Sequence, residues 1–408
     1  MFNFICNRTS ARNARNCYAI VCSFASEPYV LEFHQPYSSP SSSLSSSSSS
    51  SVTDDSGKKS ITISYLENSC GFSPARALSA SNYISFKTPE RADSVLAFLK
   101  KHQFSDAQIS TLIKRRPPIL ISKPEENLLP KFEFLESIGI PKPEIPHLIC
   151  RAPNLLARSL TKRIIPTFNL LKSSLSSSED VLFAINRCPD ILGTALDAKI
   201  EPNIEILRAS GVPERGILYC LKHMPMLLVK KRPEKLRECI ERVKQIGFRP
   251  EKNMFLQGVK VLALTVDSTW EHKVEVYKKC GWSEEEVIES FRKHPCFMLA
   301  SESKIMAVVD ILVHKVGYHV SDLATYPVVV LLSLEKTVVP RCSVYQVLLL
   351  KGLAKENLSF RKWLVCTEKS FLEMFVLCHE KEAPELLKLY REKMGLSKRV
   401  IEGNNKKS

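Results

Sequence analysis

Basic side chains recur in this chain at a fixed place, just before a proline. An arginine, lysine or histidine stands two residues before each of five prolines, and further cations flank it. We call these residues the first basic row: Lys114, Arg115, Arg116, Arg151, Arg187, Lys222, His223, Arg292 and Lys293. Cations repeated along a stacked array could follow a phosphate backbone. They could equally interact with the dipole at helix C-termini and stay solvated.

A second group of cations follows the same prolines. This second basic set consists of Arg158, Lys162, Arg163, Lys199, Lys230, Lys231 and Arg232. The whole chain has a formal net charge of +15, of which residues 61–408 carry +14. Excess positive charge on an elongated protein is typical of partners with a phosphate backbone. Both groups are therefore candidate nucleic-acid contacts.

The sequence contains no pattern typical of a catalytic or metal site. Gly-x-Gly-x-x-Gly, a complete Walker loop, Gly-x-Ser-x-Gly and His-Glu-x-x-His are all missing. The 13 cysteines include no Cys-x-x-Cys pair and the nine histidines do not cluster. Cys150, Cys188 and Cys220 fall in helical runs, which favours buried thiols in a reducing compartment. We predict a protein that is not an enzyme and has no cofactor or metal.

The prolines and a set of glycines define a repeat. Four copies of one phrase, in which two apolar residues follow the proline after one intervening position, lie 36 residues apart. The motif prolines are Pro117, Pro153, Pro189, Pro225, Pro295 and Pro327, and Val259–Ala263 fills the place of a missing copy. Glycines keep the same period at Gly139, Gly211, Gly247, Gly281, Gly317 and Gly352. A fixed period of this length indicates stacked supersecondary units.

Each unit is predicted to contain two helices. Leu128, Phe132, Leu135 and Ile138 share one helical face, and the glycine that follows is where a helix C-terminus favours a left-handed residue. A second apolar run then ends at the motif proline, as helices tend to do. The aromatic residues of the repeats, such as Phe132 and Phe291, occupy positions compatible with a core. No strand pattern competes with this interpretation.

The N-terminal residues 1–60 are predicted to be an organellar transit peptide followed by a disordered serine-rich leader. Arg8, Arg12 and Arg15 precede the first acid, Glu27, and a serine tract runs to Ser51. A secretory signal is the alternative, because residues 17–25 are a short apolar run after arginines. No apolar stretch approaches 18 residues, so no membrane span is expected. Residues 61–395 are predicted to form the repeat array and residues 396–408 a basic tail.

The repeated phrase and the segments around it resemble the mitochondrial transcription termination factor (mTERF) family, in its plant organellar branch. The similar segments are 88–96, 128–139, 199–211, 268–277, 334–342 and 369–376, which span nearly the whole chain after the leader. The chain departs from the family pattern in the fifth copy, which lacks its proline. It also departs in the second copy, where Lys172–Leu175 occupies the place of the glycine.

The resemblance implies an all-α fold, a right-handed superhelical α-solenoid of about 35-residue two-helix mTERF repeats. It also implies a positive concave face that binds nucleic acid in mitochondria or chloroplasts. Two ligands stay open: double-stranded DNA, with a role in transcription termination or regulation, and RNA, with a role in intron splicing or transcript stability. A protein-binding solenoid is a third alternative, for which the positive charge is unfavourable. We expect a monomer with no membrane association, in the mitochondrion or alternatively the chloroplast.

Overall fold

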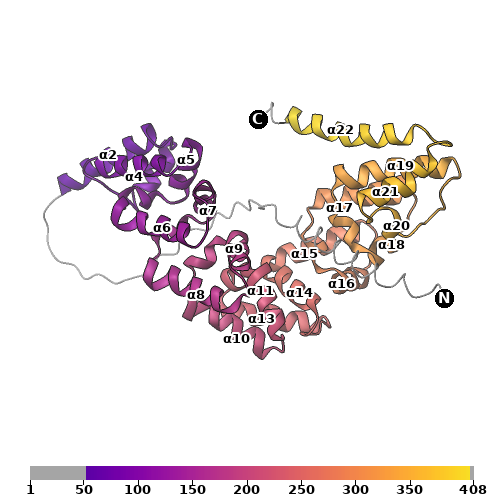
Figure 1. Ribbon diagram of the computed structural model, residues 1–408, viewed down its shortest axis with the longest axis horizontal. Helices are drawn as coiled ribbons and strands as arrows, with labels where there is room; N and C mark the ends of the chain where they lie inside the picture. The colour runs from indigo at the N-terminus through magenta and orange to yellow at the C-terminus, as the bar shows by residue number, and fades with distance from the viewer. Residues whose placement is uncertain (1–51, 405–408) are drawn as a thin grey trace. The chain divides into compact units, whose positions relative to one another are not determined.

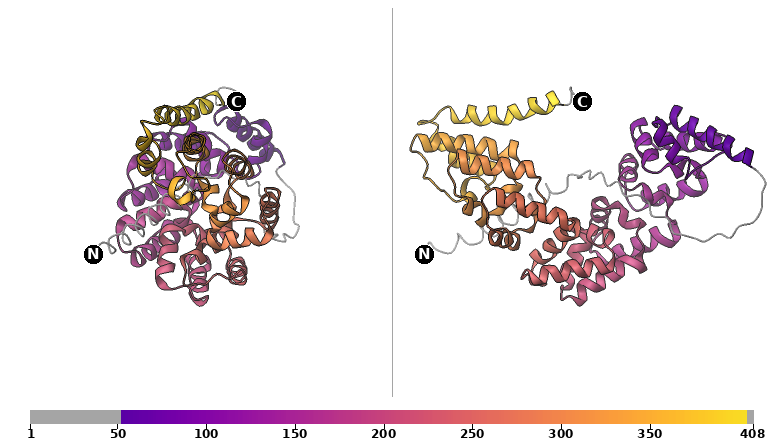
Figure 2. Two further views of the ribbon diagram at one scale, coloured as in Figure 1. Left: turned by 90° about the vertical axis from the view of Figure 1, so that its right-hand side faces the viewer. Right: turned by 180° about the vertical axis from the view of Figure 1, so that it is seen from behind.

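The computed structural model describes residues 52–404, with side chains for residues 59–395. Every regular element of this part of the chain is a helix, as Figures 1 and 2 show. Its contacts form two compact units, residues 52–238 and residues 239–404, and α13 (Pro233–Gln245) contains the boundary. The sequence prediction of an all-α fold is confirmed. The predicted leader lies outside the described residues up to residue 51, and α2 begins at Val52.

Each repeat contains three helical elements. The helix that ends before the motif proline is α5 (Asp106–Arg115), α7 (Ile145–Arg151), α9 (Ser178–Arg187), α11 (Glu214–His223), α16 (Glu284–Lys293) or α18 (Val320–Thr325). The motif proline then begins a short helix, which is η1 (Pro117–Ile121), η4 (Pro153–Ala157), η6 (Pro189–Gly193), α12 (Pro225–Lys230), η8 (Pro295–Leu299) or η10 (Pro327–Leu331). All of these short helices except α12 are 3₁₀ helices.

A longer helix completes the repeat, often with one π-helical turn. These helices are α4 (Glu90–Lys101), η2 (Pro124–Leu128) with α6 (Leu129–Ser137), η5 (Leu160–Ile164) with α8 (Ile165–Ser174), η7 (Leu196–Ile200) with α10 (Glu201–Ala209), α13, α15 (Asp267–Lys279), α17 (Glu302–Val309) with η9 (Asp310–Lys315), and η11 (Leu334–Val338) with α19 (Val339–Leu350). The other elements are α2 (Val52–Asn68), α3 (Pro74–Ala80), η3 (Lys142–Glu144), α14 (Asn253–Leu264), α20 (Phe360–Trp363), α21 (Glu368–Phe375), η12 (Leu377–His379) and α22 (Leu386–Asn404). α22 packs along α19 (Figure 2) and extends into the predicted basic tail.

The motif proline separates two helices because it restricts the residue before it. That residue leaves the helical region in every copy, for example at Arg116 (φ −145°, ψ 75°) and Cys188 (φ −145°, ψ 83°). The proline itself suits the first position of the next helix, where no backbone donor is needed. The apolar pair that follows is buried, as with Leu155 and Leu156. The phrase is therefore a short helix of its own, in addition to the two helices expected.

The regularly spaced glycines lie at left-handed helix ends. All six predicted glycines have positive φ, from 68° at Gly352 to 101° at Gly247. Gln103 occupies the same position in the first repeat and also has positive φ, 66°. The corresponding position one repeat after Gly139 has no left-handed residue, because α8 ends at Ser174 and Leu175 is extended at φ −95° and ψ 147°.

Gly247→Ala is expected to lower the free energy of unfolding by about 1–2 kcal/mol, because a Cβ is disfavoured in the left-handed region. The added Cβ would have room, since its nearest neighbour is Arg292 Nε at 3.6 Å, so the backbone alone causes the loss. The matched variant Gln103→Gly should raise stability by about 0.5–1 kcal/mol. Denaturant unfolding of both variants measures this. If both variants were as stable as the wild type, the left-handed conformation assigned to Gly247 and Gln103 would be contradicted.

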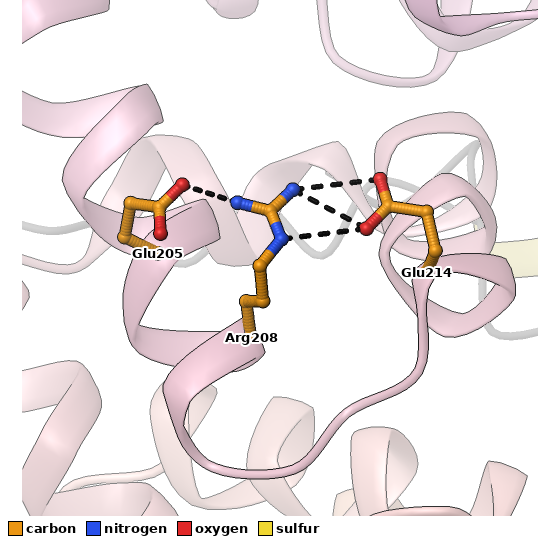
Figure 3. Close-up of polar contacts among 3 residues, drawn as sticks. All are labelled: Glu205, Arg208 and Glu214. Carbon is orange, nitrogen blue, oxygen red and sulfur yellow. Dashed lines mark hydrogen bonds and ion pairs between the residues drawn. The ribbon is translucent and has the colours of Figure 1, made fainter.

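The turn at Gly211 shows how charges join successive helices. The Arg208 guanidinium, in the last turn of α10, donates to Glu205 on its own helix and to Glu214 at the start of α11 (Figure 3). The distance from Arg208 Nη2 to Glu214 Oε2 is 3.3 Å. These two carboxylates raise the pKa of Arg208 above its ordinary value. This arginine therefore already has two acidic partners within the protein.

The repeat without a motif proline behaves differently. α14 runs without a break through Val259–Ala263, where each of the other repeats changes from one helix to a second, short helix. Its apolar side chains Val259, Val261 and Leu262 are buried all the same. The missing proline thus removes the break and leaves the packing in place.

The core is built from the residues that the helical spacing selected. Phe132, Phe248, Trp270, Trp282 and Phe291 are buried, as expected. Cys188 and Cys220 are also buried, while Cys150 is half-buried. Burial raises the pKa of Cys188 to about 11 and that of Cys220 to about 12, so these thiols are protonated at neutral pH. They pack as small apolar side chains.

Candidate nucleic-acid interface

Two arginines of the first basic row, Arg115 and Arg151, connect the C-terminal ends of successive helices. Each lies in the last turn of the helix before a motif proline, and its guanidinium reaches the last turn of the corresponding helix in the next repeat. Arg115 Nη1 donates to Cys150 O at 2.5 Å, and Arg151 Nη2 donates to Arg187 O at 3.2 Å. Arg76 Nη2 makes the same kind of bond to Lys114 O at 2.6 Å. These donors satisfy carbonyls that a helix end leaves without an intrahelical partner.

Most other members of the first basic row also have partners within the protein. Their contacts are Arg116 Nη1 to Asn154 Oδ1 at 2.7 Å, Lys222 Nζ to Asp180 Oδ1 at 2.5 Å, Arg292 Nε to Ile246 O at 2.6 Å, Arg292 Nη1 to Glu289 Oε2 at 3.3 Å, and Lys293 Nζ to Glu289 Oε1 at 3.9 Å. The helix-end interpretation therefore has direct structural support for Arg115 and Arg151. The row also joins neighbouring repeats, which the dipole argument alone did not predict.

Three members of the second basic set, Arg158, Lys162 and Arg163, line a hollow between neighbouring repeats. A cavity of about 490 Å³ is bounded by Arg158, Ser159, Lys162 and Arg163 on one repeat and by Leu196 and Asp197 on the next. Ser159 Oγ accepts from Lys162 N at 3.1 Å and so fixes the start of η5. Arg163 Nη1 lies 3.3 Å from Asp197 Oδ1, and both side chains are substantially exposed.

Arg158 packs against the next repeat, and neither Arg158 nor Lys162 at this hollow has an acidic partner. A Cβ placed on Gly193 would lie 3.2 Å from Arg158 Cγ, so the arginine stem packs closely on that glycine of the next repeat. Within the described residues, neither Arg158 nor Lys162 takes part in an ion pair. Their charges therefore face solvent without a protein counter-ion.

Cations of the second basic set also lie near one another one repeat further along. Lys199, 36 residues after Arg163, is half-buried. Burial lowers its pKa first, and the nearby charges of Lys230 and Arg232 lower it further. Lys230 Nζ lies 3.2 Å from Asp190 Oδ2, whereas Lys231 and Arg232 have no ion pair in the part of the chain described. A bound anion would reduce the repulsion within this cation cluster.

The structure brings together the parts of the second basic set that come from neighbouring repeats. Arg158, Lys162 and Arg163 lie together at the hollow, and Lys199, Lys230 and Arg232 lie near one another one repeat later. Lys231 is half-buried beside them, and its carbonyl accepts from Asn203 Nδ2 at 3.1 Å. All seven members belong to the unit formed by residues 52–238. Arg292 and Lys293 of the first basic row belong to the other unit.

The sequence analysis missed a second series of contacts between repeats. A polar side chain in each of α6, α8, α10, α15 and α17 donates to a carbonyl in or near the short helix of the next repeat, and one in α19 donates to carbonyls of the segment that follows α20. The contacts are Lys131 Nζ to Leu156 O at 2.6 Å, Thr167 Oγ1 to Thr194 O at 3.5 Å, Asn203 Nδ2 to Leu228 O at 2.9 Å, Lys304 Nζ to Leu331 O at 2.9 Å, and Lys273 Nζ to Ala300 O. Arg341 Nη1 donates to Leu364 O at 2.9 Å and Cys366 O at 2.8 Å.

A sequence signal for these donors exists. Four of them directly follow a second proline, in the pairs Pro130–Lys131, Pro166–Thr167, Pro202–Asn203 and Pro340–Arg341. Burial lowers the pKa of Lys131 and Lys304, and the carbonyl contacts compensate their charged forms. These lysines contribute to the net positive charge but are not available to a ligand.

Among residues 52–404, no helix is both long and apolar enough to cross a membrane, and no group of three His, Cys, Asp or Glu side chains is arranged to hold a metal ion. Together, the helical repeats and the cations between them define a class of protein: an α-helical repeat protein with a basic surface. The mTERF family model matches residues 96–317 and 221–372, which together cover more than half of the 408 residues. The chain belongs to the mTERF family. A comparison with curated proteins found no match.

Proposed function

We propose that this protein binds nucleic acid inside an organelle through the second basic set and thereby regulates gene expression. Membership in the mTERF family supports an organellar nucleic-acid-binding role. The observation that carries the proposal is the hollow lined by Arg158, Lys162 and Arg163. Arg158 and Lys162, which have no ion pair within the described residues, are suited to phosphate oxygens, and contacts to phosphates supply most of the affinity of sequence-independent binding. The protein would act as a monomer.

Double-stranded DNA is the ligand we propose, with a role in transcription termination or regulation. Cations on successive repeats could contact phosphates along one backbone. The mitochondrion is the proposed compartment, with the chloroplast as the alternative. A second candidate is RNA, as a factor for intron splicing or transcript stability. This candidate is favoured by the partly exposed ring of Phe183 and the half-buried ring of Tyr219, which both contact His223, because aromatic rings at a surface suit unpaired bases.

Binding to duplex DNA, to single-stranded RNA and to an intron-containing transcript tests the proposal. Affinity for at least one of these should fall steeply as salt increases, because bound cations displace counter-ions from the phosphates. Tightest binding to the duplex supports the DNA assignment, and tightest binding to the transcript supports the RNA assignment. Affinity that does not change with salt, or no binding to any of the three, would overturn the proposal.

A further inference from the structure

Lys199 is a half-buried lysine whose amine has no hydrogen bond or ion pair among the described residues. Burial lowers its pKa. Three other lysines of the described chain have a pKa lowered by burial, and each of them donates to a carbonyl: Lys131, Lys273 and Lys304. A hydrogen bond to a carbonyl stabilises the protonated amine. Lys199 differs from the other three because its nitrogen lone pair is free once the proton leaves.

The contact between two repeats sets the position of Lys199. Its helical turn, η7, packs against α12 of the next repeat. Asn203 follows Lys199 by four residues in the same continuous helix, so the two side chains lie on one face. The Asn203 amide donates to Leu228 O at 2.9 Å and to Lys231 O at 3.1 Å. The face that carries Lys199 is thereby held against residues 228–232, which include three consecutive cations.

Positive charge from this segment lies close to Lys199. After burial, Lys230 and Arg232 lower the pKa of Lys199 further. Asp190 of η6 is the carboxylate that reaches the segment, and it pairs with Lys230 at 3.2 Å. Lys231 and Arg232 have no ion pair within the described residues. A lysine that is partly desolvated and lies beside other cations has a larger neutral fraction, and the neutral amine is the nucleophile.

We propose that Lys199 is a site of acylation by thioesters of coenzyme A, and that this modification weakens the binding of nucleic acid. The neutral Nζ attacks the thioester carbonyl, an amide bond forms and the carbon–sulfur bond breaks. The amine proton passes to the departing thiolate, which leaves as the free thiol. Coenzyme A carries phosphates, and the cations Lys231 and Arg232 are suited to hold them. Acylation removes the charge of Lys199 from the second basic set, so its effect on binding rests on the proposed function.

The test incubates the full chain with acetyl-coenzyme A at neutral pH and measures the acetylation rate of each lysine by mass spectrometry. Lys369 and Lys388, whose side chains are 85% and 83% exposed, are internal references. Lys199 should react at least about fivefold faster than either reference, since each unit of lower pKa gives about ten times more neutral amine. S-acetyl-N-acetylcysteamine, a thioester without phosphates, should show a smaller preference for Lys199. An equal preference with both donors would overturn the role of the cations in holding the donor.

Lys230→Gln combined with Arg232→Gln is expected to slow acetylation of Lys199 by about three- to tenfold. The matched control is Lys100→Gln combined with Lys142→Gln, which removes two exposed cations of the same unit and should leave that rate unchanged. If Lys199 reacts no faster than the references, or at the same rate in both double variants, the acylation site is overturned and the proposed function stands.

The effect on binding is measured with duplex DNA when most of Lys199 is acetylated. Treatment with acetyl-coenzyme A should weaken binding by the wild type about three- to tenfold. The same treatment of Lys199→Arg should leave its affinity at the value that this variant has before treatment. Equal losses in the two proteins would assign the effect to other lysines, and no loss in the wild type would show that acylation does not regulate binding. Either result overturns this part of the proposal.

Discussion

The variant in which Arg158, Lys162, Lys231 and Arg232 are all glutamine is expected to bind nucleic acid at least about 100-fold more weakly than the wild type. Each cation that contacts a phosphate releases counter-ions, so the slope of log affinity against log salt should become shallower by about 3 to 4. Glutamine keeps much of each side-chain stem and removes only the charge. Electrophoretic or anisotropy titrations at several salt concentrations measure both quantities.

The control for this experiment removes four charges elsewhere. Lys100, Lys142, Lys369 and Lys388 have exposed side chains that pair only with surface carboxylates. Their substitution by glutamine lowers the net charge equally and should change affinity by less than about tenfold. Equal losses in the two variants would mean that overall charge, and not the second basic set, determines binding.

The first basic row gives a contrasting variant. Arg115→Gln with Arg151→Gln removes two hydrogen bonds between repeats, so about 1 kcal/mol of stability should be lost for each bond. Its affinity should change less than that of the variant in the second basic set, since these guanidinium groups already have protein partners. A large loss of affinity with unchanged stability would return Arg115 and Arg151 to the interface.

Arg341→Met is expected to lower the free energy of unfolding of the unit formed by residues 239–404 by about 3–5 kcal/mol. The side chain of Arg341 is only 5% exposed, and Nη1 donates to three carbonyls, those of Trp363, Leu364 and Cys366. Its guanidinium also lies over the Phe371 ring, 4.8 Å from the centroid. Methionine fills part of the volume but leaves those buried carbonyls without their donor, which is costly.

Trp363 reports this change directly, because its indole stacks on Tyr345 with centroids 4.2 Å apart. Its fluorescence in a denaturant titration follows unfolding of this unit. Arg361→Met, at an exposed position nearby, should change stability by no more than about 0.5 kcal/mol. A loss below about 1 kcal/mol for Arg341→Met would show that the buried contacts contribute little.

The sequence predicts the repeat boundaries well because proline and glycine act locally. A proline restricts the residue before it whatever surrounds it, and a left-handed helix end favours glycine for the same steric reason. The short helices at the motif prolines were not predicted. Their five or six residues carry the same apolar pair that a turn would carry, and only the backbone hydrogen bonds distinguish a short helix from a turn. The left-handed Gln103 was also missed, because the first of the regularly spaced glycines, Gly139, lies one repeat later.

The candidate interface is less predictable, because a cation's partner is set by the stacking of repeats. Arg115 and Arg158 look alike in the sequence, yet Arg115 donates to a carbonyl 35 residues away while Arg158 faces a hollow. Charge and repeat period alone cannot distinguish an arginine that bonds to a carbonyl of the next repeat from one that lines the hollow. The proline before Lys131 and Arg341 was a usable signal for the buried donors.

Crosslinking of bound nucleic acid to the full-length protein, followed by mass spectrometry of the crosslinked peptides, tests the central claim most directly. The proposed function predicts crosslinks within residues 157–166 and 230–237, the two segments that contain every member of the second basic set except Lys199. Crosslinks confined to residues 239–404, or to Arg115 and Arg151, would contradict it.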